Sequence, residues 1–411
     1  MKRGELEARL LILVTLGLVA FGLVMVYSAT SAPAALGGGN PMSYLERQGT
    51  YAVLGLALMI MGGRFDYRRL RELAPGLVLV SLVLCLAVLG IGAQVNGAHR
   101  WISLGPAGFQ PSELAKLTLA IWVAAYLARR KAPQTLKQVW KPVGLLTTVF
   151  AALVIVEPDL GTVIAIGIIV AAILLVSGTP GRVLASAVVI ATSLGLLAIY
   201  LEPYRRARFF SFINPWHDAQ GTGFQTVQAM IGLGSGGIFG VGLGQGVQKV
   251  FYLPEAHTDM IFAIIGEELG LVGATAVIAA YGLFAYAGLK IALGCKDPFG
   301  KRLAAGLTAL VCGQAVINLC AVLGLAPLTW IPLPFVSYGG SSLVLALAAV
   351  GILLNIAGSR GAEARAQLPD RRRGDGRPRA ALARSGGSAA RPRRAGDVRR
   401  VAGSRGGATR P

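Results

Sequence analysis

Long uninterrupted apolar runs dominate the chain, and short polar or basic segments separate them. A helical run of roughly 20 apolar residues is long enough to cross a bilayer. The runs are continuous rather than alternating, which excludes a transmembrane β-barrel. We therefore expect an all-α, polytopic helical membrane protein with about ten transmembrane helices, over residues 10–29, 48–63, 73–92, 113–128, 142–157, 160–177, 183–201, 260–292, 303–325 and 335–356.

Basic residues concentrate in the segments that would share one side of the membrane. These segments are "MKRGELEAR", "RFDYRRLRE", "ARRKAPQTLKQVWK", "KIALGCKDPFGKR" and an Arg-rich tail. Positive charge marks the cytoplasmic side, so the N and C termini are both expected to be cytoplasmic. The opposite side then receives a large extracytoplasmic loop between spans 7 and 8. The segment 260–292 is too long for one untilted span, and it is either one long helix or a re-entrant piece over 260–270 followed by a span.

Composition agrees with a membrane protein and locates the charge. The 411 residues are 54% hydrophobic and only 14% charged, whereas soluble proteins carry about a quarter of their residues as charges. Much of the net charge of +20 lies from Arg360 onward, where 15 arginines face four carboxylates. That segment lacks the apolar residues to build a core. We predict a transmembrane domain over 1–357 and a disordered cytoplasmic tail over 358–411 that contacts anionic lipids.

Several functional classes find no support in the sequence. The tail has no fold or aromatic platform for nucleic acid, so no nucleic-acid partner is expected. The four cysteines form no CxxC or Cys/His spacing, which argues against a disulfide framework or a zinc site. HExxH, Walker A and GxSxG motifs are also missing from the sequence.

The stretch "LPEAHTDMIF" places Glu255, His257 and Asp259 where an apolar helix begins. Asp259 is interpreted either as the helix N-cap or as a general base at the membrane surface. A helix N-terminus lowers the pKa of a carboxylate and an apolar cleft raises it, so a useful base requires the second effect to win. Glu267 and Glu268 follow two turns later, and we expect them to be paired structurally.

Two further pairs of charged residues lie at the ends of predicted spans. Glu113 and Lys116 in "QPSELAK" are spaced i,i+3 and therefore face the same way, as a salt bridge or as part of a polar cavity. Glu157 and Asp159 flank Pro158 in "EPDLGT", a tight turn between two spans. They are interpreted as turn and cap residues or as a carboxylate rim over the same cavity.

Candidate phosphate contacts occur on the extracytoplasmic side. Arg205, Arg206 and Arg208 stand beside aromatic residues, which fits interfacial anchoring or a phosphate-bearing headgroup that guanidinium grips bidentately. Ser341 and Ser342 in "PLPFVSYGGSSL" open a span, where free N–H groups form either a simple cap or a phosphate seat.

A Gly-rich stretch, "GLGSGGIFGVGLGQG", follows a segment that begins as an amphipathic helix. It contains G-x-G-x-x-G spacing, but no strand precedes it, so dinucleotide binding is rejected. We expect the glycines to let the backbone pass close to a bulky substrate or to act as hinges.

The motifs quoted above, with "GAHRWISLG" and "GVQKVFYLPEAHTD", resemble the SEDS family of bacterial peptidoglycan glycosyltransferases over about residues 10 to 357. "GLGQGVQKVFYLPEAHTD" and "GILLNIA" are similar to its FtsW, cell-division branch. Met260 stands where that branch usually has Phe, and Trp330 stands where Gly is usual.

The resemblance implies a glycosyltransferase that polymerises lipid II at the outer face of the cytoplasmic membrane. Asp259 matches the essential aspartate of the family, which would deprotonate the acceptor 4-hydroxyl as it attacks the donor's anomeric carbon. Undecaprenyl pyrophosphate would leave, giving a β-1,4 glycan by inversion. Glu113 and Lys116 match polar residues of the family's central cavity. Further substrate contacts are expected at Arg100, Lys249, Arg205, Arg206 and Arg208 on charge grounds, and at His257, Glu157, Asp159, Ser341 and Ser342.

The resemblance also implies partners and a location. A class B penicillin-binding transpeptidase would crosslink the new strand, other divisome membrane proteins would assemble with it, and the protein would lie in the bacterial cytoplasmic membrane at the division septum. A divalent cation such as Mg²⁺ or Mn²⁺ is expected only as an aid to the leaving group, since the sequence shows no preformed metal site. Two alternatives stay open at this point, a lipid II flippase and a non-catalytic divisome scaffold.

Overall fold

The computed structural model describes residues 5–36, 40, 42–95, 98–104, 107–250 and 252–366. The chain divides into a unit over Met1–Gln367 and a second unit over Leu368–Pro411, which lies outside the described residues. The last described helix, α13 (Gly340–Ala366), continues past the predicted domain border at 357. The rest of the predicted tail falls outside the described residues.

The first unit is a helical bundle, as expected. Among the described residues, eight segments are long and apolar enough to cross a membrane. They contain α1 (Glu5–Leu36), η1 with α3 (Tyr67–Arg69, Leu70–Ile91), α5 with η2 and α6 (Leu136–Val139, Trp140–Gly144, Leu145–Val156), α7 (Leu160–Ser177), α8 (Gly181–Leu201), α11 (Ile261–Gly294), α12 (Pro298–Val322) and α13.

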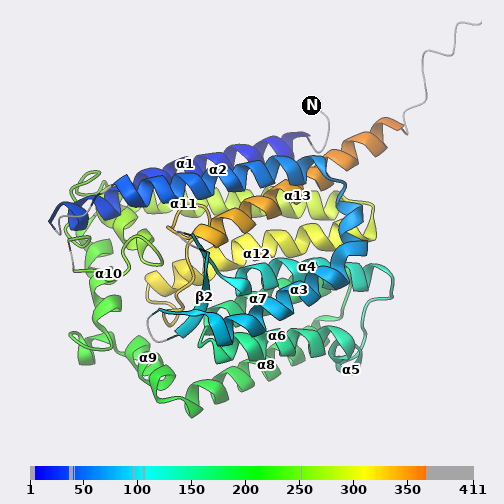
Figure 1. The fold of residues 1–411 in the computed structure, drawn as a ribbon, viewed down its shortest axis with the longest axis horizontal. Coiled ribbons are helices and arrows are strands. Elements are labelled where there is room, and N and C mark those ends of the chain that lie inside the picture. The colour runs from blue at the N-terminus through cyan, green and yellow to red at the C-terminus, as the bar shows by residue number, and fades with distance from the viewer. Residues whose placement is uncertain are drawn as a thin grey trace, which may run out of the picture. The chain divides into compact units, whose positions relative to one another are not determined.

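The two remaining predicted spans correspond to α2 (Met42–Arg64) and α4 (Pro111–Ala128). Polar and small residues interrupt their apolar runs, so by composition alone they do not qualify as spans. Both are nevertheless part of the bundle, because α2 packs along α13, and α4 packs against α3 and α12. In Figure 1 they run alongside the qualifying helices.

A small antiparallel sheet, which the all-α expectation did not include, connects α3 to α4. It consists of β1 (Ala93–Val95), β2 (Ala98–Leu104) and β3 (Ala107–Phe109), in the order β1-β2-β3. Ile102 pairs with Phe109 across β2 and β3. This sheet positions Arg100 near the end of α6.

The long connection between α8 and α11 contains helices of its own. These are α9 (Pro203–Ile213), η3 (Pro215–Asp218) and α10 (Phe224–Ser235), and Figure 1 shows α9 and α10 at the left end of the bundle. The predicted amphipathic helix is α10. The preceding helix α8 has no buried residue, so its apolar surface is left for lipid.

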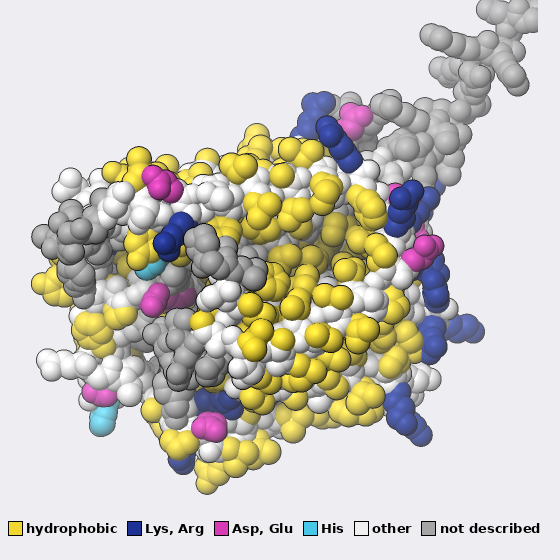
Figure 2. All heavy atoms as spheres, viewed as in Figure 1, with side chains coloured by type: hydrophobic (Ala, Val, Ile, Leu, Met, Phe, Trp, Pro, Cys, Tyr) yellow, Lys and Arg dark blue, Asp and Glu magenta, His cyan; other side chains and the backbone are white. Residues whose placement is uncertain are grey.

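Charge separates the two ends of the bundle. Figure 2 shows Lys and Arg gathered mainly at the right end, with a broad apolar band beside them. Arg68, Arg129 and Asp297 line one cavity there, so three of the basic loops meet at this end. The start of α1 and the end of α13 also lie there (Figure 1). The arrangement fits the positive-inside rule with this end in the cytoplasm.

The structure decides how residues 260–294 are arranged. α11 is broken at Gly270, whose φ of 64° and ψ of −162° are not helical. Backbone N–H groups of Val241 and Gly242 donate to the carbonyls of Glu267 and Glu268, at 3.0 Å each. The Gly-rich stretch therefore binds the carbonyls that the break leaves free.

Two of these glycines approach the backbone of α11, and the expected approach of the stretch to a substrate stays a prediction. A Cβ on Gly240, whose φ is +80°, would collide with the carbonyl oxygen of Glu268, and one on Gly236 would collide with the carbonyl oxygen of Gly266. The close approach that excludes side chains is therefore to the backbone of α11.

Candidate active site

Asp259 lies in the loop that leads into α11, at the end of the bundle opposite to the basic loops. Its side chain is only 4% exposed, and its Oδ1 accepts a hydrogen bond from Thr258 Oγ1 at 3.2 Å. The residue before α11 is Met260, and no side chain caps that helix. The N-cap interpretation of Asp259 is therefore wrong, and its carboxylate is available for another role.

The surroundings of Asp259 favour its neutral form more than those of an ordinary aspartate. Burial is the main cause that raises the pKa of Asp259 to about 7, and the nearby charge of Glu255 acts in the same direction. The hydrogen bond from Thr258 and the charge of Arg208 oppose this rise. A carboxylate with a pKa near the working pH is a suitable general base.

Aromatic rings enclose His257, two residues before Asp259. Its ring centroid lies 5.0 Å from that of Tyr44 and 5.5 Å from that of Tyr338. The backbone N–H of Tyr338 also donates to the carbonyl of His257 at 2.9 Å. Burial lowers the pKa of His257, so the ring is neutral at pH 7 and presents a polar edge rather than a cation.

Asn318 holds the backbone of Asp259 in place. The side-chain amide of this α12 residue donates to the carbonyl of Asp259 at 2.7 Å and to the carbonyl of Ile331 at 2.8 Å. Asn318 is itself buried. It therefore ties the loop before α11 to the loop before α13 at one point.

The pairing of Glu113 with Lys116 is confirmed. Lys116 Nζ lies 2.7 Å from Glu113 Oε1, and both side chains are buried near the start of α4. In the orientation of the Gln314 amide that gives both of its polar atoms a partner, the nitrogen donates to the carbonyl of Leu310 and the oxygen accepts a hydrogen bond from Lys116. Gln314 lies one helical turn before Asn318, so α12 presents the Glu113–Lys116 pair and the Asp259 loop along one face. Their role in substrate binding stays a prediction.

The turn between α6 and α7 carries Glu157, Asp159 and Pro158. Asp159 caps α7, accepting hydrogen bonds from the backbone N–H and the hydroxyl of Thr162. Arg100 donates from Nε to the carbonyl of Glu157 at 2.7 Å and from Nη2 to the carbonyl of Pro158 at 2.8 Å. The structure thus gives Arg100 and Asp159 structural partners.

Glu157 differs from its neighbours in this turn. Its side chain is 1% exposed, and neither carboxyl oxygen has a hydrogen-bond partner among the described residues. Burial chiefly raises the pKa of Glu157 to about 8, and the nearby charge of Asp159 adds to the effect. Glu157 is therefore protonated at neutral pH and could donate a hydrogen bond to a ligand.

The three arginines of α9 bind carbonyls and aromatic rings. Arg205 donates to the carbonyls of Ala198 and Ile155, and Arg206 lies over the ring of Tyr200. Arg208 donates to the carbonyl of Leu328 and lies 4.7 Å from the ring centroid of Trp330. All three arginines therefore have partners within the protein, and their anchoring in the membrane interface stays a prediction.

Trp330 has a backbone conformation that glycine adopts more easily. Its φ is +58°, in the left-handed region, where a bulky residue is strained. The stacked guanidinium of Arg208 covers its ring. Trp330, at a position where glycine is usual, thus provides a ring on which Arg208 stacks. The pair lies next to Ile331, whose carbonyl Asn318 binds.

Lys249 lies in the interior rather than on a surface. Its side chain is 2% exposed, and its Nζ lies 2.6 Å from Glu268 Oε1 and 3.2 Å from the hydroxyl of Ser28. Glu267 accepts hydrogen bonds from the backbone N–H groups of Val247 and Gln248. The structural pairing predicted for Glu267 and Glu268 is confirmed, and Lys249 is already bound in it.

Ser341 and Ser342 are buried at the start of α13. Ser341 Oγ accepts a hydrogen bond from the backbone N–H of Gln110, just before α4. This contact joins the start of α13, which follows Tyr338, to the start of α4, which contains Glu113. Within the described part of the chain, no group of three or more His, Cys, Asp or Glu side chains is arranged to hold a metal ion.

Sequence reasoning missed four residues that contact His257 or Asp259. Asn318 could have been noticed as an amide inside an apolar span, where polar side chains need a reason. Tyr44 and Tyr338 look like ordinary interfacial aromatics, and Thr258 carries no motif of its own. Only the folded chain brings them together.

Comparisons with known proteins agree with this geometry. The FtsW/RodA/SpoVE family, described as cell cycle proteins, matches residues 8–361. A probable peptidoglycan glycosyltransferase FtsW from Geobacter metallireducens is 41% identical over 359 residues, covering 87% of this chain and 96% of its own length. Stage V sporulation protein E of Bacillus subtilis is 39% identical over 354 residues, covering 84% and 96% of the two chains.

Solved structures resemble the fold over most of its length. One is a chain of a peptidoglycan synthase complex in which polymerization and crosslinking are structurally coordinated. It has a TM-score of 0.71 and 31% identity, and covers 85% of this chain and 97% of its own. The rod shape determining protein RodA of Thermus thermophilus gives a TM-score of 0.62 at 31% identity, with 85% and 96% covered.

Proposed function

We propose that this chain, which belongs to the FtsW/RodA/SpoVE family of cell cycle proteins, uses Asp259 as the general base of a peptidoglycan glycosyltransferase. The protein is a multi-pass membrane enzyme. Its substrate is lipid II, which it polymerises into β-1,4 glycan strands at the outer face of the membrane. The single observation that carries the assignment to Asp259 is a buried carboxylate, with a pKa of about 7, that caps no helix.

The reaction requires one proton transfer and one displacement. Asp259 removes the proton from the acceptor 4-hydroxyl, and the freed oxygen forms a bond to the anomeric carbon of the donor. The bond from that carbon to the pyrophosphate oxygen breaks, and undecaprenyl pyrophosphate leaves with the electron pair. Attack from the opposite face inverts the anomeric centre, which gives the β linkage. The proton on Asp259 then passes to solvent.

Neighbouring residues would orient this step. Asn318 fixes the backbone of Asp259, and the Glu113–Lys116 pair lies along the same face of α12. The charge of Arg208 acts on Asp259 and lowers its pKa. Arg208 is therefore our candidate for the cation that attracts the departing pyrophosphate.

A divalent cation would be held by few protein ligands. Mg²⁺ is commonly bound by one or two carboxylates together with substrate phosphates, and Glu255, whose charge acts on nearby Asp259, offers one such carboxylate. When bound, the ion would neutralise charge on the leaving group. Glu255 is the residue that would hold it, since Asp259 must remain free to take the proton.

The relatives support a proposal for the partner and the location. One similar structure is part of a peptidoglycan synthase complex that couples polymerization to crosslinking. A class B penicillin-binding transpeptidase is the corresponding partner for this chain, alongside other divisome membrane proteins. The similarity to proteins named FtsW supports a role in cell division, in the cytoplasmic membrane at the septum.

A polymerisation assay separates this function from a flippase and from a scaffold. The purified protein, with its transpeptidase partner, is incubated with fluorescent lipid II in detergent, where there is no membrane to cross. Glycan chains that form with the wild type and not with Asp259→Asn support the polymerase. Lipid II translocation in liposomes without chain growth would instead indicate a flippase. Partner binding without either activity would indicate a scaffold.

A further inference from the structure

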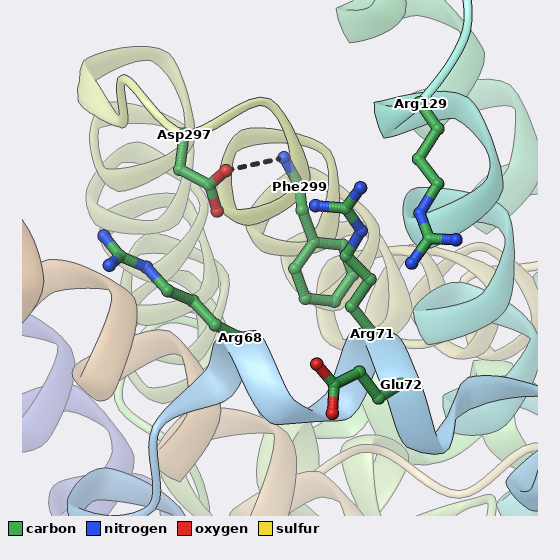
Figure 3. Close-up of a pocket in the computed structure, with 6 residues that line it drawn as sticks. All are labelled: Arg68, Arg71, Glu72, Arg129, Asp297 and Phe299. Carbon is green, nitrogen blue, oxygen red and sulfur yellow. Dashed lines mark hydrogen bonds between the residues drawn. The ribbon is translucent and has the colours of Figure 1, made fainter.

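Three arginines converge on a cavity at the cytoplasmic end of the bundle, away from the proposed active site. The cavity has a volume of about 350 Å³ and is lined by Arg68, Arg71, Glu72, Arg129, Asp297 and Phe299. Figure 3 shows that these side chains come from the start of α3, the end of α4 and the start of α12. Its volume lies at the lower end of the range of small-ligand sites, about 300–1,000 Å³.

The acidic side chains in the cavity do not neutralise these arginines fully. Asp297 is already engaged, because its Oδ2 accepts hydrogen bonds from the backbone N–H of Gly300 at 2.9 Å and from the hydroxyl of Tyr67 at 3.0 Å. Glu72 is exposed to solvent, where its charge is screened. The lining therefore keeps a net positive charge.

One hydrogen-bond donor of the cavity, on the side chain of Arg71, has no partner in the part of the chain that the structure describes. Arg71 Nε is buried and has no hydrogen-bond partner among the described residues. A buried donor without a partner is costly, so an acceptor in the cavity would stabilise the arrangement. In Figure 3, Arg129 reaches from α4 toward the guanidinium group of Arg71. Two adjacent guanidinium groups suit a phosphate, which accepts several hydrogen bonds at once.

The cavity lies at the ends of three helices of the bundle, where a membrane-spanning helix would meet the lipid headgroups. The spans that contain α3 and α12 begin at Tyr67 and Pro298, and α4 ends at Ala128, one residue before Arg129. The lining residues therefore occupy the first or last turn of three membrane-embedded helices. Two helix N-termini also contribute partial positive charge there.

We propose that this cavity binds the phosphate of an anionic phospholipid from the cytoplasmic leaflet, through Arg71 and Arg129. A bound headgroup joins the ends of α3, α4 and α12. The site is separate from the Arg-rich tail, since all of its residues belong to the helical bundle. It is also independent of the proposed reaction at Asp259.

Native mass spectrometry of the full-length protein, titrated with phosphatidylglycerol against phosphatidylcholine, tests the proposal. The double substitution Arg71→Gln/Arg129→Gln should weaken phosphatidylglycerol binding about 100-fold, because losing one charge-assisted hydrogen bond to the phosphate lowers the affinity about tenfold. The matched control Lys137→Gln/Lys141→Gln removes two exposed cations from another cytoplasmic loop and should change binding less than about twofold. Equal losses in both double variants would mean diffuse attraction and would overturn the site.

Two further arms complete the test. Inorganic phosphate at millimolar concentration should fail to displace the bound lipid; displacement would identify a soluble phosphate as the ligand and refute the lipid assignment. If the glutamine variant does not fold, Arg71→Lys/Arg129→Lys keeps the charge and loses the planar fork of donors. That variant should bind phosphatidylglycerol more weakly than the wild type, and unchanged binding would contradict the proposal.

Discussion

Replacing Asn318 by alanine removes the clamp on Asp259 without touching its carboxylate. Two hydrogen bonds, at 2.7 and 2.8 Å, are lost from a buried amide, and two carbonyl oxygens lose this donor. Each such loss costs about 1–2 kcal/mol, so the free energy of unfolding should fall by about 2–4 kcal/mol. A displacement of about 1 Å in a catalytic group can reduce the rate about 100-fold. We therefore expect Asn318→Ala to lower kcat by about 10- to 100-fold.

Asn355 provides the matched control at the other end of the bundle. Its amide donates to the carbonyl of Gly63 at 2.8 Å and accepts from the backbone N–H of Tyr67 at 3.1 Å. Asn355→Ala should lose a similar amount of stability and keep kcat within about twofold of the wild type, since it lies far from the chemistry. Thermal unfolding and lipid II polymerisation are measured on the same preparations in detergent. Equal losses of kcat in the two variants, or full activity in Asn318→Ala, would refute the positioning role.

Three other outcomes follow from particular contacts. Gly240→Ala should destabilise the protein by at least about 2 kcal/mol, because its φ is +80° and the new Cβ would meet the carbonyl of Glu268. As the control, Gly282→Ala should change stability by less than about 1 kcal/mol, because a Cβ on Gly282 would face open space. Lys249→Met should lower the free energy of unfolding by about 3–5 kcal/mol, because Glu268 stays buried without its partner. Adding Glu268→Gln should restore most of that stability together with activity. A double variant that is stable but inactive would indicate that Lys249 contacts the substrate. The pKa of Glu157 is about 4.5 in the unfolded chain and about 8 in the folded protein. The free energy of unfolding of the wild type should therefore decrease as the pH rises from 4.5 to 8, by up to about 1.4 kcal/mol per pH unit. Thermal unfolding of Glu157→Gln should lack this pH-dependent loss.

The membrane helices and the contact between Glu113 and Lys116 were predictable from sequence, because each depends on residues that lie close together in the chain. Apolar runs of bilayer length located the helices, and the i,i+3 spacing of Glu113 and Lys116 correctly predicted their contact. The pattern could not decide how residues 260–294 are arranged, because one long helix and a re-entrant piece bury similar residues. The break at Gly270 depends on hydrogen bonds from the Gly-rich stretch, which folding brings to it.

The candidate site was harder to predict, since its contacts join distant segments. Lys249 was expected to contact the substrate, because its partner Glu268 lies 19 positions away in a different element and the sequence does not reveal the pairing. Asn318 is 59 positions from Asp259, and no motif marks it as the residue that binds the carbonyl of Asp259. The short strands β1 to β3 also carry too few residues to show an alternating pattern.

The central claim is that the carboxylate of Asp259 takes a proton from the acceptor hydroxyl. The pH dependence of kcat/KM for lipid II polymerisation, in the wild type and in Asp259→Asn, tests this claim most directly. A base must be ionised to act, so the wild-type rate should rise about tenfold per pH unit below a pKa of about 7 and level off above it. Asp259→Asn should be slower by about 100-fold or more, with this acidic limb lost. A variant that keeps the wild-type rate, or the same acidic limb, would contradict the account.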